Sequence, residues 1–379
     1  MTTVWDDVVG QEPAVEVLRA AAEHPEKMTH AWLLTGPPGS GRSNAARAFA
    51  AALQDPSADP HSPGCAQVLA GTHPDVTFVA TEGVVIRAET VRPLVELAQR
   101  SPAQGRWRVI VIEDADRLNE TSGNVLLKAI EEPPPRTVWL LCAPSPQDVL
   151  VTIRSRSRAV ALRVPPVQAV ADLLVRRDGI DPTVALTAAK AAQSHVGVAR
   201  RLARDPAARA RRDQVLRLAS QVRGVGDAVL AAADLVETAQ ADAKAATEER
   251  DAAERTALLR SLGAEGTTTI PPALRGQIRQ LEEEQKRRAT RAQRDVLDRA
   301  MVDLLSLYRD VLVVQLGAGV DLVNGEQEEA VRDLARSSTP EQNLHRMDAV
   351  TEARERLAGN VSPLLAVEAM MIGLRPQRA

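Results

Sequence analysis

Cysteine, aromatic side chains and net charge are all scarce in this sequence, and each shortage excludes a class of function. Cys65 and Cys142 are the only cysteines among 379 residues. Two cysteines form neither a disulfide framework nor a four-thiolate zinc site, which favours a reducing compartment. The sequence also lacks any run of about 18 apolar residues, and no apolar stretch of signal-peptide length follows Met1. We therefore expect a cytoplasmic protein that makes no membrane contact.

The net charge and the small number of aromatic side chains argue against a protein that binds nucleic acid by itself. Lys and Arg number 47, and Asp and Glu number 50, which gives a formal net charge of −3. Such a balance creates no positive field that would draw the whole chain onto DNA. Two Phe, one Tyr and four Trp are also too few for a platform on which single-stranded bases stack. Any contact with DNA must be local or shared with partners.

The first half of the sequence contains a series of short apolar runs separated by helical segments. The runs are Ala31–Thr35, Val76–Ala80, Val109–Ile112, Thr137–Ala143 and Val160–Val164. Short apolar runs that alternate with helices are typical of the buried strands of a parallel sheet. Residues 1–165 are therefore predicted to form an α/β domain with a five-stranded parallel sheet.

The remainder of the chain has a helical pattern, and its length calls for further domains. Residues 166–206 are predicted to form a small lid of short helices that break at Gly179, Pro182 and Gly197. Residues 207–379 are predicted to be all-helical, with a loop over 263–272. Acidic side chains precede basic ones by four positions near 282–288, which stabilises a helix by about 0.3–0.5 kcal/mol per pair. Because these charges alternate in sign, they predict a solvated helical hairpin near 238–300 rather than a basic DNA-binding arm.

Gly36–Ser43 carries the first candidate site. It reads GPPGSGRS, which fits the phosphate-binding pattern G-x-x-x-x-G-K-[ST] except that Arg42 replaces the lysine. A loop of this kind between a strand and a helix cradles phosphates with its backbone N–H groups, although a Gly/Pro-rich turn without a ligand is the alternative. A planar guanidinium differs from the compact ammonium that reaches the β- and γ-phosphates, so the pattern does not support hydrolysis. The candidate residues for ATP or ADP with Mg²⁺ are Gly36, Gly39, Ser40, Gly41, Arg42, Ser43 and Asn44.

Glu113 and Asp114 form the second candidate site, at the end of the run Val109–Ile112. Acidic residues at the end of a buried strand hold Mg²⁺ and polarise water in phosphate-loop ATPases, where Asp precedes Glu. The order is inverted here, so each side chain differs by one methylene from the one that its role requires. Carboxylates that are merely solvated at a strand end are the alternative.

Several segments together resemble the bacterial clamp-loader subunits, a family of AAA+ proteins. They are VVGQE at Val8–Glu12, THAWLLTGPPGSGRS leading into the phosphate loop, GTHPD at Gly71–Asp75, NVLLKAIEEPP at Asn124–Pro134 and TIRSRS at Thr152–Ser157. The resemblance covers residues 1–205 and implies an AAA+ module followed by a helical lid and a helical collar for oligomerisation. It also places Val9 in the segment that lies beside the adenine base.

The resemblance further distinguishes the hydrolysing motor subunits of this family from its non-hydrolysing stator. Arg42, the inverted acidic pair, and Pro144 in place of a hydroxyl-bearing Thr all depart from the motor pattern. We therefore expect the stator role, with an active gamma-like ATPase as the alternative. A DNA-binding AAA+ helper outside the replisome is a third reading, which the segment Asn124–Pro134 disfavours.

Two arginines acquire candidate roles from the resemblance. TIRSRS is similar to the S-R-C motif of the family with Ser157 in the Cys position, so Arg156 corresponds to the arginine finger that reaches a γ-phosphate held by a neighbouring subunit. A solvated basic edge made with Arg154 and Arg158 is the alternative. In the lid, GVAR aligns with the second sensor of the family, which makes Arg200 the residue directed at the γ-phosphate of its own subunit.

The resemblance also bears on metals and partners. Family members commonly carry four cysteines before the GTHPD segment, whereas this chain has only Cys65 there, with His61 and His73 nearby. We therefore expect no zinc. The implied partners are the gamma/tau and delta subunits and, through the assembled complex, the beta sliding clamp and primed DNA. The implied cellular location is the replisome at the nucleoid.

Overall fold

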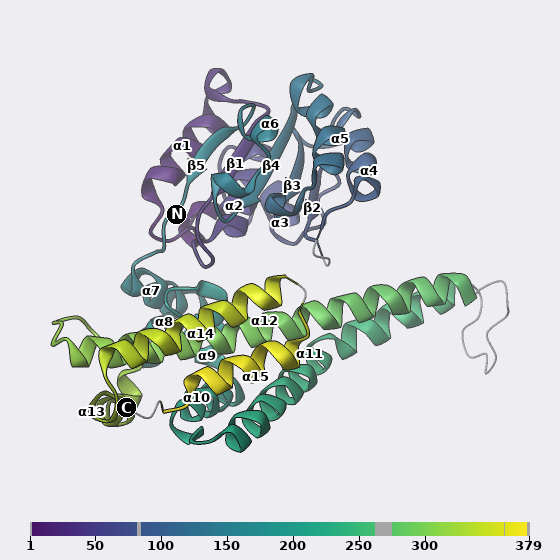
Figure 1. Ribbon diagram of the computed structural model, residues 1–379. Helices are drawn as coiled ribbons and strands as arrows, with labels where there is room; N and C mark the ends of the chain where they lie inside the picture. The colour runs from purple at the N-terminus through teal and green to yellow at the C-terminus, as the bar shows by residue number, and fades with distance from the viewer. Residues whose placement is uncertain (1, 82–84, 262–274, 360, 377–379) are drawn as a thin grey trace. The chain divides into compact units, whose positions relative to one another are not determined.

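The computed structural model describes residues 2–81, 85–261, 275–359 and 361–376 (Figure 1). The chain divides into two compact units, Met1–Arg204 and Asp205–Ala379. Residues predicted to form the lid belong almost entirely to the first unit, and their independence as a domain stays a prediction. In the described part of the chain, no helix is both long enough and apolar enough to span a bilayer.

A five-stranded parallel sheet forms the centre of the first unit, which confirms the predicted α/β class. Its strands are β1 (Ala31–Thr35), β2 (Val76–Val79), β3 (Arg108–Ile112), β4 (Thr137–Ala143) and β5 (Arg158–Ala161). Their order in the sheet is β2-β3-β4-β1-β5. All neighbouring pairs are parallel, so the carboxyl ends of β3, β4 and β1 lie at one edge of the sheet. The phosphate-loop segment and the acidic pair both begin at this edge.

Helices cover both faces of this sheet because successive strand residues point to opposite sides. Trp32 packs with Phe49 and Leu18 on one face, whereas its neighbour Leu33 packs with Leu126 on the other. The helical segments of the first unit are η1 (Val4–Asp7), α1 (Glu12–Glu23), η2 (Pro25–Lys27), α2 (Arg42–Gln54), α3 (Pro63–Leu69), α4 (Ala88–Ala98), η3 (Ala115–Arg117), α5 (Glu120–Glu131), η4 (Pro146–Asp148), α6 (Val151–Arg154), α7 (Val167–Asp178), α8 (Pro182–Ala191) and α9 (Val196–Arg204).

Two local predictions were wrong. The last strand, predicted at Val160–Val164, begins and ends earlier as β5. It is the edge strand beside β1 and only Val160 is buried, so the apolar run marks its position poorly. Gly197 also does not break a helix but lies in the first turn of α9. The break comes before it, where Gln193 and Ser194 adopt positive φ angles of 50° and 65°.

The second unit is helical wherever it is described, in agreement with the predicted class. Its segments are α10 (Pro206–Gln221), α11 (Val225–Ser261), α12 (Arg275–Gln315), η6 (Gly325–Gln327), α13 (Glu328–Ser337), α14 (Pro340–Ala358) and α15 (Pro363–Leu374). An apolar core that includes Leu304, Tyr308, Val350 and Met370 joins these helices. The loop predicted at 263–272 lies outside the described residues.

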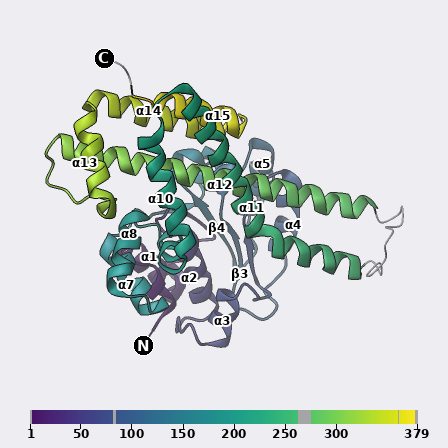
Figure 2. The ribbon, with the colours of Figure 1, turned by 90° about the horizontal axis from the view of Figure 1, so that it is seen from below.

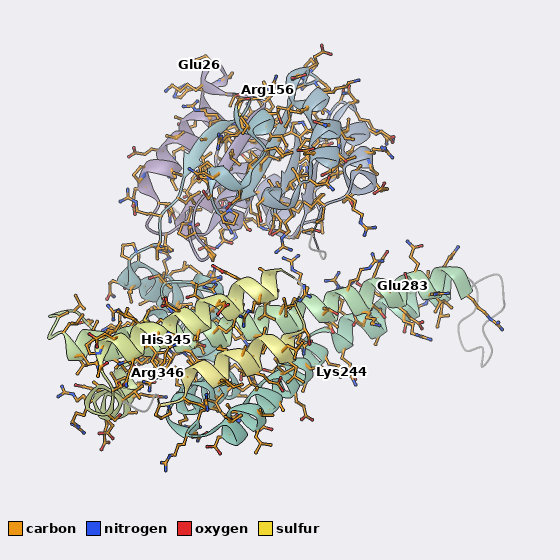
Figure 3. The ribbon with its side chains drawn as sticks, in the orientation of Figure 1. Glu26, Arg156, Lys244, Glu283, His345 and Arg346 are labelled. Carbon is orange, nitrogen blue, oxygen red and sulfur yellow. The ribbon has the colours of Figure 1, made fainter. Side chains whose placement is uncertain are left out.

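The helices α11 and α12 run side by side as a long hairpin (Figures 1 and 2). Arg288 joins them, with its Nη1 2.7 Å from Asp251 Oδ1 and 3.0 Å from Glu254 Oε2. Charges of both signs lie along the hairpin, as Lys244 and Glu283 illustrate in Figure 3. The mixed charge is consistent with a solvated surface rather than a nucleic-acid-binding arm.

Candidate functional site

The backbone of the Gly36–Ser43 loop depends on its glycines. Gly39 and Gly41 have φ angles of +88° and +84°, which side-chain-bearing residues rarely adopt. A Cβ on Gly36 would lie 2.6 Å from both the Leu162 carbonyl oxygen and Ser40 Oγ, so this position accepts no side chain without a shift. A Cβ on Gly39 would lie 3.1 Å from the Cα of His195, which shows that the start of α9 approaches the loop closely.

Arg42 turns its side chain back onto this loop. It is the first residue of α2, and its Nη1 donates a hydrogen bond of 2.6 Å to the carbonyl oxygen of Gly36. The guanidinium therefore bridges the two ends of the loop that would enclose phosphates. A lysine at this position would carry a compact charge on a flexible stem in place of the planar guanidinium.

Ser43 and Glu113 lie in direct contact. Ser43 Oγ donates a hydrogen bond of 3.0 Å to Glu113 Oε2, and Arg47 Nη2 lies 3.8 Å from Glu113 Oε1. Asp114 instead accepts a hydrogen bond of 3.1 Å from the backbone N–H of Thr81. Ser43 and Glu113 thus stand where ATPases have a hydroxyl and a carboxylate that bind Mg²⁺, but here they are bonded to each other. The second carboxylate, Asp114, is bonded to Thr81 instead.

Gln11 is a residue of this site that the sequence analysis did not single out. Its buried amide donates hydrogen bonds of 3.0 Å to the Ser40 carbonyl oxygen and 2.5 Å to that of Arg163, and its Oε1 accepts one of 3.1 Å from Arg163 N–H. The side chain therefore ties the loop to the segment that leaves the sheet. Val9, the predicted adenine-side residue, is half-buried in the same N-terminal segment, and Asn44 is half-buried in the first turn of α2.

Strand β4 lies between β1 and β3, and it is followed by Pro144, where the motor pattern has a hydroxyl-bearing Thr. Cys142 near the end of β4 is fully buried, and its Sγ donates to the Arg42 carbonyl oxygen at 3.9 Å. Burial raises the pKa of this thiol to about 12, so it stays neutral. Pro144 follows the strand and is half-buried. Ser40 Oγ is buried and has no hydrogen-bond partner among the described residues.

Arg156 lies in the turn between α6 and β5, at the surface of the first unit (Figure 3). Its Nε is 2.7 Å from Glu131 Oε1 at the end of α5, and its Nη1 donates to the Thr152 carbonyl oxygen at 3.0 Å. Ser157 Oγ donates to the Ile153 carbonyl oxygen at 2.9 Å and so closes the turn. The side chain of Arg156 remains 40% exposed, which leaves it accessible to another molecule.

The neighbouring arginines have different contacts. Arg154 Nη1 donates to the Pro146 carbonyl oxygen at 3.2 Å. Arg158 Nη1 donates to the Lys27 carbonyl oxygen at 2.9 Å, and its guanidinium lies 4.9 Å from the centre of the Trp32 ring. Arg154 is thus held by the neighbouring η4 segment, and Arg158 by the segment before β1.

Arg200 on α9 points toward the end of α7. Its Nη2 lies 3.1 Å from Asp178 Oδ1, an oxygen that it shares with Arg204 at 2.9 Å. The Asp178 side chain is buried, so this cluster holds the ends of two lid helices together. In this arrangement Arg200 is committed to an ion pair within the lid.

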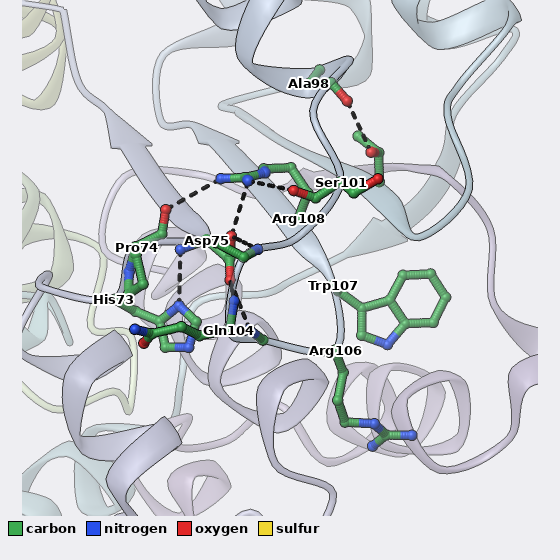
Figure 4. A network of polar contacts seen from close by, with 12 residues as sticks. His73, Pro74, Asp75, Ala98, Ser101, Gln104, Arg106, Trp107 and Arg108 are labelled. Atoms are coloured by element: carbon green, nitrogen blue, oxygen red, sulfur yellow. Dashed lines mark hydrogen bonds and ion pairs between the residues drawn. The ribbon is translucent and has the colours of Figure 1, made fainter.

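The GTHPD segment forms a structural network rather than a ligand site (Figure 4). The buried Asp75 carboxylate accepts three hydrogen bonds of 2.7 Å from the backbone N–H groups of Ala103, Gln104 and Gly105, and lies 3.0 Å from Arg108 Nη2. Burial acts to raise the pKa of Asp75, but these N–H groups and Arg108 outweigh it and hold the pKa below its usual value. The network fixes the loop that leads into β3.

Cys65 lies in a similar structural setting. It is buried in α3, its Sγ donates to the Ala51 carbonyl oxygen at 3.5 Å, and burial raises the pKa of its thiol. His73 accepts a hydrogen bond of 3.1 Å from the backbone N–H of Asp75 at its Nδ1. The described ranges contain no group of three or more His, Cys, Asp or Glu arranged to hold a metal ion.

The sheet order, the glycine-rich loop after β1 and the acidic pair after β3 define an AAA+ phosphate-loop module. Residues 10–166 match the family described as "DNA polymerase III, delta subunit". DNA polymerase III subunit delta' of Pseudomonas aeruginosa is 36% identical over 41% of this chain and 50% of its own length. Subunit gamma/tau of Mycobacterium tuberculosis is 32% identical over 45% of this chain and 30% of its own length. A DNA polymerase III gamma subunit-related protein of Thermotoga maritima aligns over 96% of this chain and 98% of its own, with 15% identity and a TM-score of 0.43.

Residues 10–166 are therefore similar to clamp-loader subunits of DNA polymerase III, in agreement with the expected family. The matched region spans half or less of the length of the two curated relatives. The relatives include both gamma/tau and delta' subunits, so the choice between these two roles depends on the residues of the site.

Proposed function

We propose that the chain is the delta prime, or stator, subunit of the DNA polymerase III clamp loader. In this role it lends Arg156 to ATP held by a neighbouring gamma/tau subunit while the complex, which also contains delta, places the beta sliding clamp on primed DNA. The helical second unit would serve as the collar through which the subunits assemble. The observation that carries the proposal is the contrast between Arg42, which is bonded within its own loop, and Arg156, which is exposed.

The residues of the phosphate loop do not fit a hydrolysing Mg²⁺–ATP site. The loop offers backbone N–H groups to phosphates, but Arg42 donates to Gly36 instead of extending from the loop. Glu113 is bonded to Ser43, and Asp114 is bonded to Thr81. A magnesium ion would require the first of these pairs to separate, and the strand end would still lack the Asp-then-Glu order that positions metal and water.

Arg156 has the features of a residue that acts across an interface. A guanidinium placed on a γ-phosphate neutralises charge that develops during phosphoryl transfer, and its loss costs about 10³-fold or more in rate. A partly exposed side chain on a short turn meets this requirement, because another subunit can approach it. Arg154 and Arg158 are less suited, since Arg154 is half-buried at the turn and bonded to Pro146, and Arg158 donates to Lys27 and lies over the Trp32 ring.

Two measurements of ATP turnover test the proposal. The isolated chain is expected to show no turnover above background. The assembled complex carrying Arg156→Ala is expected to lose turnover by about 10³-fold. Arg19→Ala is the matched control, because Arg19 is exposed on α1, and this variant should match the unaltered complex. Robust turnover by the isolated chain would instead identify an active gamma-like ATPase, and full activity of the Arg156→Ala complex would exclude the finger.

A further inference from the structure

Glu131 is the only described carboxylate that contacts Arg156. Its Oε1 lies 2.7 Å from Arg156 Nε, and the two side chains are 43% and 40% exposed. Glu131 is the last residue of α5, whose preceding residues Ile130 and Ala129 are buried in the core of the sheet. The carboxylate therefore extends from a fixed point of the fold toward a residue on a short surface turn.

The position of Glu131 is unfavourable for the helix that carries it. Negative side chains are disfavoured at the C-terminus of a helix, where the backbone dipole is itself negative. Glu131 and Glu132 both lie at this end of α5. Helix stability thus gives no reason for a carboxylate at Glu131, whereas the contact with Arg156 does.

The contacts of Arg156 leave one part of its guanidinium available. Nε is paired with Glu131, and Nη1 donates to Thr152 O at 3.0 Å and to Ser155 Oγ at 3.2 Å. Nη2 has no hydrogen-bond partner within the described ranges. Two of the three nitrogens are therefore held by the chain itself, and the third retains both of its N–H groups for an incoming oxygen.

We propose that Glu131 is a positioning residue for Arg156, an inference that rests on the finger role proposed above. A free arginine side chain samples many rotamers, and freezing them when a phosphate arrives opposes the reaction. The Glu131 carboxylate fixes the guanidinium before the neighbouring subunit docks. It thereby lowers the ordering cost that would otherwise be added to the activation barrier.

The test compares three variants in the assembled complex with its gamma/tau and delta partners. Glu131→Ala is expected to lower the single-turnover rate of ATP hydrolysis about tenfold, since one guanidinium contact is lost while the finger remains. Glu131→Gln retains an oxygen beside Nε and the length of the side chain, and should recover most of this loss. Glu132→Ala, which removes the adjacent exposed carboxylate, should leave the rate unchanged.

Two further readouts separate positioning from a general structural role. The affinity of the complex for ATP should be unaffected by Glu131→Ala, because Arg156 acts after nucleotide binding. In an Arg156→Ala complex, adding Glu131→Ala should cause no further loss, because the residue acts through the arginine. An additional loss in this double variant would show a role independent of Arg156 and overturn the inference.

The remaining outcomes distinguish the two proposals. If Arg156→Ala lowers the rate but Glu131→Ala does not, the finger stands and the positioning role is excluded. If both Glu131 variants raise the rate, the carboxylate opposes the finger by repelling phosphate, which also overturns the inference. If Arg156→Ala itself has no effect, the proposed function is refuted and the role of Glu131 with it.

Discussion

Replacement of Asp75 by Asn tests how the loop before β3 is held. All four groups that contact the carboxylate are donors: the N–H groups of Ala103, Gln104 and Gly105, and the Arg108 guanidinium. An amide in place of the carboxylate turns one acceptor oxygen into a donor. Whichever oxygen is replaced, two donors lose their acceptor, and the buried Arg108 loses its counter-charge. Breaking a buried charge pair in this way costs about 3–5 kcal/mol.

The aromatic residues provide a specific assay for this unit. All four tryptophans, Trp5, Trp32, Trp107 and Trp139, belong to the first unit, so urea unfolding followed by tryptophan fluorescence reports on it alone. The matched control is Asp148→Asn, because Asp148 is exposed after β4. We expect the midpoint of Asp75→Asn to fall by the equivalent of about 3–5 kcal/mol while the control stays within about 0.5 kcal/mol. A loss below about 1 kcal/mol would refute the reasoning.

The same variant should change how steeply the free energy of unfolding falls at acid pH. The pKa of Asp75 is lower in the folded chain than its unfolded value of about 3.9. Its contribution is therefore fully present above the unfolded pKa and is lost as the pH falls through the folded pKa. Unfolding midpoints measured from pH 6 to about pH 2 should fall less steeply for Asp75→Asn than for the unaltered chain. Parallel curves would show that the carboxylate is not held ionised by these donors.

Two further predictions concern the phosphate loop and the thiols. Arg42→Lys replaces the guanidinium that is bonded to Gly36 with a compact ammonium, so the affinity of the isolated chain for ATP should rise in equilibrium dialysis, whereas Arg19→Lys should leave it unchanged. An unchanged or lower affinity in Arg42→Lys would show that the guanidinium does not limit binding. Cys142 and Cys65 are buried with raised pKa values, so neither should react with iodoacetamide at pH 8 until urea unfolds the chain. Rapid labelling of the native chain would contradict their burial.

Local patterns in the sequence were sufficient to locate the sheet and the loop. β1 and β4 coincide with their predicted runs because continuous burial leaves a continuous apolar signal. β5 was displaced because an edge strand buries only part of its length. Gly36–Ser43 was found by spacing, since the positive φ angles at Gly39 and Gly41 require glycine.

The partners that individual side chains contact could not be predicted in the same way. Gln11 contacts Arg163 across 152 positions, and only the folded chain brings them together. Arg42 fits the pattern of a ligand-binding residue, yet its rotamer is decided by the carbonyl of Gly36. Likewise, the end of α5 shows a run of acidic residues in sequence, but the partner of Glu131 depends on how the turn after α6 packs.

The internal bond between Arg42 and Gly36 has a thermodynamic consequence. A diffusible nucleotide stabilises the fold that binds it by an amount that grows with the logarithm of its concentration. The Arg42 guanidinium is part of the chain, so its effective concentration at the loop is constant. In the proposed role, the order of this loop is independent of the energy charge of the cell. The conformation of this subunit would then stay constant while its neighbours change conformation as they bind and release ATP.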